Sequence, residues 1–160
     1  MSAIPLDSVI CRNAAERGVE IIDGSLISAR ARLDERRFDC ILFLNVLHLV
    51  REPVEVLSLF SDLLSPDSTI IIQSPNMSNI PALWRQLRNR RFEMPLDYES
   101  AGAHFSFRGR VEKWCKNAGL TTERTVGVLH RRAEPFEAIT PGIARLALAS
   151  DIISVARKNA

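Results

Sequence analysis

The 160-residue sequence contains no run of apolar residues that approaches the ~18 needed to cross a membrane. Its first segment, MSAIPLDSVI, also lacks the basic region followed by an apolar core that marks a secretory leader. We therefore predict that the protein resides in the cytoplasm and has no membrane partner.

Cysteine is scarce, and its spacing matches no metal or redox motif. The three cysteines, Cys11, Cys40 and Cys115, form neither a CxxC pair nor a zinc-ligand pattern, and the three histidines add no ligand spacing. Cys40 lies in an apolar run and Cys115 lies on the apolar side of a helical pattern. We interpret the cysteines as buried thiols in a reducing compartment, and we predict no metal site.

The sequence also lacks an excess of either charge. Its 21 basic and 19 acidic residues leave a formal charge of +2 and are spread over the whole length. This balance creates no long-range field that would favour nucleic acid or an acidic membrane. A nucleic-acid hypothesis would need Trp84 as a stacking platform, but Trp84 falls on an apolar helical stripe and is interpreted as core, so we expect no nucleic-acid partner. The basic residues that the hypothesis would use are Arg85, Arg88, Arg90, Arg91, His130, Arg131 and Arg132.

The composition, 46% hydrophobic and 25% charged, is that of one ordinary globular domain, and no internal repeat is present. We therefore predict a single domain over residues 1–160. Its most strongly marked strand is FDCILFL (38–44), which is apolar on both faces, as in an interior parallel strand covered by helices on each side. TIIIQ (69–73) has the same apolar, β-branched character, and we predict that it pairs with 38–44.

Helical periodicity alternates with the predicted strands. This alternation indicates a parallel sheet sandwiched by helices, and two last strands joined without a full helical crossover indicate an antiparallel pair. We predict an α/β fold, a three-layer sandwich with a mostly parallel sheet and an antiparallel closing pair. The other predicted strands are 3–6, 19–22, 121–129 and 151–157; the helices are one from Asp7 to Gly18, one from Glu52 through Leu64, one along Ile80–Leu87, one from Val111 to Gly119, and a short one within 130–150.

Five stretches cover nearly the whole chain in a recognisable order: AIPLD (3–7), GVEIIDGSL (18–26), FDCILFLNVLHLVREP (38–53), LLSPDSTIIIQSPN (63–76) and HFSFRGRVEKWCKNAGL (104–120). No single stretch is diagnostic, but together they resemble class I S-adenosylmethionine-dependent methyltransferases that act on small molecules. Residues 38–53, for example, are similar to the family pattern FDVVLxxNVLEHVxDP. The resemblance implies a Rossmann-like methyltransferase fold, S-adenosyl-L-methionine as cofactor and a small-molecule methyl acceptor.

The resemblance also assigns residues to a site. Ligands of open parallel sheets bind beyond the carboxyl ends of the strands, so the residues after 38–44 face the crevice. By resemblance, Asn45 and Val46 contact the cofactor, while His48 lies on the substrate side as the catalytic base for the acceptor proton. The alternative is that His48 only packs or caps in the following turn. His104 is the second candidate base, and its alternative is a supporting role before a helix.

The chain departs from the family where the cofactor site begins. It has no counterpart of the first strand or of the glycine-rich loop that approaches the ligand. Pro5 stands where the family has an acid for the ribose hydroxyls, and Asp7 is the nearest substitute. Ser25 replaces the adenine-binding acid, and a neutral hydroxyl makes a weaker hydrogen bond than a carboxylate. The predicted cofactor-binding residues are Asp7, Gly24, Ser25, Leu26, Asn45 and Val46.

The absent first strand leaves two functional hypotheses. That strand is central in the family's sheet, so a chain without it must leave a gap, re-pair its strands or recruit another chain. The first hypothesis is an amino-terminally truncated methyltransferase domain, whose partner is a second copy of the chain or a complementing amino-terminal fragment. The second hypothesis is a non-catalytic methyltransferase-like remnant or partner subunit.

Overall fold

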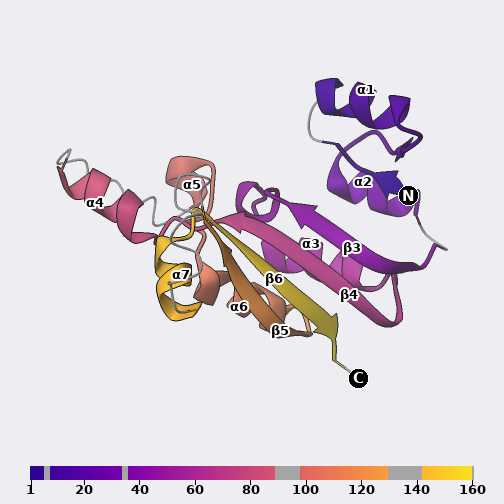
Figure 1. Ribbon diagram of the computed structural model, residues 1–160. Coiled ribbons are helices and arrows are strands. Elements are labelled where there is room, and N and C mark those ends of the chain that lie inside the picture. Colours follow the sequence, from indigo (N-terminus) through magenta and orange to yellow (C-terminus); the bar gives the residue numbers. More distant parts are fainter. Residues whose placement is uncertain (6–7, 34–35, 89–97, 130–141, 160) are drawn as a thin grey trace. The chain divides into compact units, whose positions relative to one another are not determined.

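The computed structural model describes residues 1–5, 8–33, 36–88, 98–129 and 142–159. The chain divides into two compact units, 1–37 and 38–160, and each is described by itself. The described strands form a two-stranded sheet in the first unit and a four-stranded sheet in the second (Figure 1). The single domain expected over 1–160 stays a prediction.

The described part of the first unit contains two short parallel strands and two helices. Strand β1 (Ser2–Ala3) pairs with β2 (Glu20–Ile21), so that Ser2 lies opposite Glu20. Both strands are shorter than the predicted 3–6 and 19–22. Helix α1 (Ser8–Glu16) connects β1 to β2 in the sequence. Gly18 follows this helix with a φ of 77°, the left-handed conformation expected after a helix end. The predicted cap, Asp7, lies outside the described residues.

Helix α2 (Leu26–Ala31) was not predicted, because the arginines around it obscure the apolar periodicity. Its start is nevertheless encoded locally. The Ser25 hydroxyl accepts a hydrogen bond from the Ser28 backbone N–H at 3.2 Å, which is the usual contact of a helix cap. Where burial is described in this unit, the buried apolar side chains are Ile22, Ala29 and Leu33.

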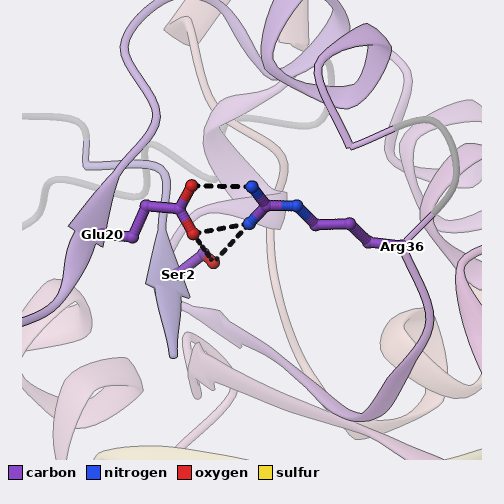
Figure 2. A network of polar contacts seen from close by, with 3 residues as sticks. All are labelled: Ser2, Glu20 and Arg36. Carbon is purple, nitrogen blue, oxygen red and sulfur yellow. Dashed lines mark hydrogen bonds and ion pairs between the residues drawn. The ribbon is translucent and has the colours of Figure 1, made fainter.

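An ion pair ties the strands of the first unit to the segment that follows them (Figure 2). The Arg36 guanidinium donates to both oxygens of the Glu20 carboxylate, at 2.5 and 2.8 Å. The Ser2 hydroxyl donates to the same carboxylate at 2.7 Å. The hydrogen bonds from Arg36 and then Ser2 lower the pKa of Glu20 to about 2. All three side chains lie at or near the surface, where ion pairs contribute little to the free energy of unfolding. The main effect of the network is to fix the positions of the short strands.

The sheet of the second unit has the order β3 (Phe38–Leu44), β4 (Leu64–Pro75), β6 (Asp151–Lys158) and β5 (Leu120–Val128). Strands β3 and β4 are parallel, as predicted for 38–44 and 69–73, and β5 and β6 are antiparallel, as predicted for the last two strands. β6 also runs antiparallel to β4. β4 begins before 69, because helix α3 (Pro53–Ser61) ends earlier than its apolar pattern indicated.

One face of this sheet forms the core of the unit. Alternate residues of neighbouring strands lie on it, and helices α3 and α6 (Arg108–Asn117) cover it on one side (Figure 1). The Phe60 ring of α3 meets the Phe43 ring edge-on at 5.7 Å between centroids. On α6, Glu112 accepts a hydrogen bond from Thr125 of β5. The fully buried residues of this face include Ile70, Ile72, Ser74, Ile152, Ser154 and Ala156.

The opposite face corrects the prediction of a strand buried on both sides. Leu42 and Leu44 of β3 are 54% and 58% exposed, and the Cys40 thiol, predicted to be buried, is exposed as well. Among the described strands β3 pairs only with β4, so it is an edge of the sheet. The predicted third layer is therefore not seen over Leu42 and Leu44. An apolar pattern on both faces of a strand indicates that both faces should be packed against other elements. It does not identify which segments of the protein pack there.

The remaining helices lie near the carboxyl ends of β3, β4 and β5. They include the 3-10 turn η1 (Leu47–Leu49), α4 (Ile80–Arg88), α5 (Tyr98–Ala101) and α7 (Gly142–Leu148). α6 ends before Gly119, which has a φ of 74°, and α7 is the short helix predicted within 130–150. No helix in the described part of the chain is long and apolar enough to cross a membrane.

Trp84 is not a core residue, contrary to the sequence prediction. Its side chain is 67% exposed, and Ile80 and Leu87 on the same stripe of α4 are also exposed. Helical periodicity predicted the stripe, but it cannot say whether another element packs on it. Of the basic residues considered with Trp84, Arg88 is exposed, while Arg90, Arg91 and 130–132 lie outside the described residues.

We predict that the first unit opens more readily than the second, because its strands are only two residues long. The amides of Glu20 and Ile22, which bond to Met1 and Ala3, should exchange hydrogen faster than the β4-bonded amide of Asn45. Glu20→Gln should accelerate exchange in the first unit only. Glu123→Gln, which removes an exposed ion pair with Arg157 in the second unit, is the matched control. Equal protection of both units would contradict the prediction.

The pH dependence of this opening follows from the lowered pKa of Glu20. A carboxyl group whose pKa is lower in the folded state stabilises that state above its ordinary pKa of 4.5. The stabilisation is lost as the pH falls toward about 2. Exchange of the Glu20 and Ile22 amides, corrected for intrinsic rates, should therefore increase over this interval, and Glu20→Gln should remove the dependence.

Candidate functional site

The candidate site of the second unit begins where β3 ends. Asn45 has a φ of 54°, a left-handed conformation that asparagine tolerates better than most residues. Its backbone N–H donates to the Gln73 carbonyl of β4 at 3.0 Å, which continues the parallel ladder by one residue. The Asn45 side chain is exposed and Val46 is buried. Of these two predicted cofactor contacts, only Asn45 therefore presents a polar side chain at the surface.

His48 lies in η1 and is only 9% exposed. Its Nδ1 atom has no hydrogen-bond partner among the described residues, although a buried polar atom normally has one. Burial lowers the pKa of His48, and the charge of His104 lowers it further. The imidazole is therefore neutral near pH 7, the form that can accept a proton. Its burial also fits the alternative of a residue that packs in the turn.

His104 supports the segment that carries His48. Its backbone N–H donates to the His48 carbonyl at 2.7 Å, and its Nε2 lies 3.0 Å from the Arg51 carbonyl. The ring packs against Tyr98 and meets Trp114 of α6 at 5.5 Å between centroids. These contacts favour the supporting role over a second base.

Further buried polar groups lie in β4, directly after it and just before α6, and the sequence prediction missed them. The hydroxyls of Ser74 and Ser106 are fully buried without a partner in the described structure, as is His48 Nδ1. Asn76 donates from its side chain to the carbonyls of Leu146 and Ala149, which fixes α7 to the end of β4. Met77 donates to the Ser106 carbonyl at 2.9 Å. Serine and asparagine after a strand are typical of turns, so their sequence signal was indistinguishable from that of an ordinary loop.

The first unit holds the other predicted cofactor residues together in one turn. Gly24 has a φ of 118°, a backbone conformation that side-chain-bearing residues rarely adopt, so this position favours glycine. Ser25 caps α2, and Leu26 is the first residue of that helix. The Ser25 hydroxyl is thus engaged by Ser28 and is not a free counterpart of the family's acid. Asp7 lies outside the described residues.

The chemistry of these groups is that of binding and proton acceptance. In the described ranges, no three His, Cys, Asp or Glu residues come together in a group that could hold a metal ion. An exposed amide and a buried, neutral imidazole lie after the end of β3, while the hydroxyls of Ser74, within β4, and of Ser106 are fully buried in the packed interior. The amide and the imidazole can orient a polar ligand at the edge where parallel sheets bind theirs.

No protein-family model matches the sequence, and no curated protein matches it significantly. Solved structures are similar throughout its length. A mitomycin 7-O-methyltransferase aligns with 99% of this chain at a TM-score of 0.60 and 16% identity, and an O-methyltransferase from neocarzinostatin biosynthesis, solved with S-adenosyl-L-homocysteine, aligns with 99% at 0.60 and 12%. A SAM-dependent methyltransferase from Thermotoga maritima aligns with 99% at 0.64 and 16%. The fold is that of SAM-dependent methyltransferases.

The chain matches only part of the length of these methyltransferases. The chain spans 41% and 42% of the first two structures and 72% of the Thermotoga maritima protein. At these identities the similarity establishes the methyltransferase fold, and the fold alone does not assign an activity. The roles of Asn45, Val46 and His48, and of the first-unit residues, therefore stay predictions.

We predict that the pKa of His48 lies below its ordinary value of 6.5. Because a buried histidine resists protonation, the free energy of unfolding should decrease as the pH falls below 6.5 and through the folded pKa. His104→Gln removes a neighbouring positive charge and should raise the pKa of His48. Titration of the imidazole signals by NMR, assigned with His48→Gln, measures both effects. A His48 pKa at or above 6.5 would show that the imidazole is not desolvated as described.

Proposed function

We propose that this chain is the carboxyl-terminal part of an S-adenosylmethionine-dependent methyltransferase domain that acts on a small-molecule acceptor. We propose further that it binds the cofactor only with a complementing amino-terminal segment. The free edge of β3 carries this proposal. A central strand of this fold should not end a sheet, yet β3 pairs on one side only within the described strands.

The edge of β3 has the chemistry of a strand-binding surface. Its unpaired backbone groups can extend the sheet, and Leu42 and Leu44 offer apolar contact to a new neighbour. Asp39 is the single charge along the strand, so the edge has little of the charge that protects free edges in soluble proteins. An apolar strand followed by a glycine-rich turn would fit beside β3 and bring its turn to the end where Asn45 lies.

The described residues fit part of the cofactor. Asn45 can hold a polar end group beyond β3, whereas Pro5 and the engaged Ser25 hydroxyl offer no acid for the ribose or the adenine. The cofactor supplies the methyl group when bound, and such transfer needs mainly positioning and a dry site. Among the described residues, neutral His48 is a group that can take up the acceptor's proton when the acceptor reaches it.

The second candidate is a non-catalytic methyltransferase-like subunit. The hydrogen bond from the Ser28 N–H to Ser25 favours it, because the residue at the family's adenine position already serves to start a helix. The burial of His48 is compatible with both candidates. Cofactor binding by the complemented chain distinguishes them.

We predict that the chain alone binds S-adenosylhomocysteine very weakly in calorimetric titration. Each missing charge-assisted hydrogen bond costs about 1.5–3 kcal/mol, and about 1.4 kcal/mol is a factor of ten in affinity. Two or three such losses weaken a micromolar site by several powers of ten. Low-micromolar binding by the chain alone, abolished by Asn45→Ala, would show that no complement is needed.

The complemented chain should behave differently. When the chain is co-expressed with a segment encoded in frame upstream that contains an apolar strand and a Gly-x-Gly turn, we expect low-micromolar binding. Asn45→Ala should abolish it. Asn117→Ala, at the exposed end of α6, is the matched control and should not change it. A stable complex without cofactor binding would favour the non-catalytic subunit, and a homodimer of the chain alone would assign the β3 edge to a second copy.

A further inference from the structure

The turn that carries His48 is short and partly exposed. In η1, a 3-10 turn of three residues, the Leu49 backbone N–H donates to the Val46 carbonyl at 2.9 Å, and the Val46 cap position makes no side-chain hydrogen bond. The Leu49 side chain is 46% exposed, so packing does little to fix this part of the backbone. Contacts from other segments of the second unit are therefore important for the position of the turn.

Two side chains of a later segment contact the backbone around this turn. His104 donates from its backbone N–H to the His48 carbonyl, and its Nε2 lies 3.0 Å from the Arg51 carbonyl. The Tyr98 hydroxyl, at the start of α5, donates to the Leu49 carbonyl at 3.1 Å. Tyr98 thus holds the backbone of the residue that directly follows His48.

Neighbouring groups restrict the orientation of the Tyr98 ring. The His104 ring lies 5.0 Å away between centroids, with 36° between the two planes. The Arg51 guanidinium lies 6.0 Å from the centre of the Tyr98 ring and forms an exposed ion pair with Glu99. These contacts reduce the number of positions open to the phenol hydroxyl, which favours a specific hydrogen bond to Leu49.

The position of the His48 imidazole determines what it can do. A base must lie within hydrogen-bond reach of the proton that it takes up, so the turn has to hold the ring in one place. We propose that Tyr98 is a positioning residue for His48, and that its hydroxyl acts through the Leu49 carbonyl. This inference rests on the proposed function for the role of His48 as a base, but the position of the imidazole can be measured in the chain alone.

Tyr98→Phe tests the proposal, because it removes the hydroxyl and keeps the ring. The backbone amides of Leu49 and His104 should then exchange hydrogen about fivefold faster, since the turn opens more often. Better access of water should raise the pKa of His48 toward its ordinary value of 6.5. NMR of the chain without cofactor measures both the exchange and the imidazole titration. If neither changed, the proposal would be overturned.

Two further variants separate the hydroxyl from other effects. Tyr98→Leu also removes the ring, so it should accelerate exchange of the same amides more than Tyr98→Phe does. If only Tyr98→Leu had an effect, ring packing would position the turn and the role of the hydroxyl would be refuted. Ser61→Ala is the control, because it removes a hydroxyl that donates to the Ser58 carbonyl at 2.8 Å within α3. Equal acceleration in Ser61→Ala would indicate a general loss of stability and would overturn the specific role of Tyr98.

This outcome can be separated from that of the methyltransferase proposal. The measurements contain no S-adenosylhomocysteine, so a failure of cofactor binding would leave the effect of Tyr98 on the position of His48 intact. Conversely, a complemented chain that binds S-adenosylhomocysteine, combined with no effect of Tyr98→Phe on the turn, would refute only the inference about Tyr98.

Discussion

The second unit depends on the one-sided pairing of β3. Its hydrogen bonds to β4 fix the register, and Phe43 anchors it against Phe60 on the covered face. The same pairing holds Asn45 at the end of the ladder, from which the turn of His48 begins. The other side of β3 contributes neither a neighbour nor cover within the described residues. The backbone of the candidate site is therefore ordered from one side, by its pairing with β4.

Local sequence patterns predicted the strands and helices of this fold more successfully than they predicted which side chains are buried. Parallel pairing of 38–44 with 69–73, the antiparallel last pair and the helix ends at Gly18 and Gly119 all follow from short-range periodicity and glycine conformation. The exposure of Leu42 and Cys40 could not be predicted in the same way. It depends on which segments are present to pack on them, which is a property of the assembled chain. α2 was missed because it is only six residues long and the arginines around it obscure its apolar periodicity.

The candidate site shows the same division. Asn45 and His48 were selected by the family resemblance as residues that follow the most strongly marked strand, and the structure places them at its carboxyl end, while their roles stay predictions. Ser74 and Ser106 were missed because isolated serines carry no distinctive signal until burial removes their partners. The groove along β5, between the start of α6 and α7, also had no signal in the sequence. Arg108, Arg124 and Arg145 come from separate segments, and only the packing of α7 on β5 brings them together.

The position of the two tryptophans determines what optical spectroscopy can detect. Trp114 is 7% exposed beneath the sheet, while Trp84 is 67% exposed on α4, so the protein contains one shielded and one hydrated emitter. Both belong to the second unit, as does the single tyrosine, Tyr98. Intrinsic fluorescence is consequently blind to residues 1–37. A sharp single transition recorded in this way would describe the second unit alone, and the state of the first would require a backbone probe such as far-ultraviolet circular dichroism.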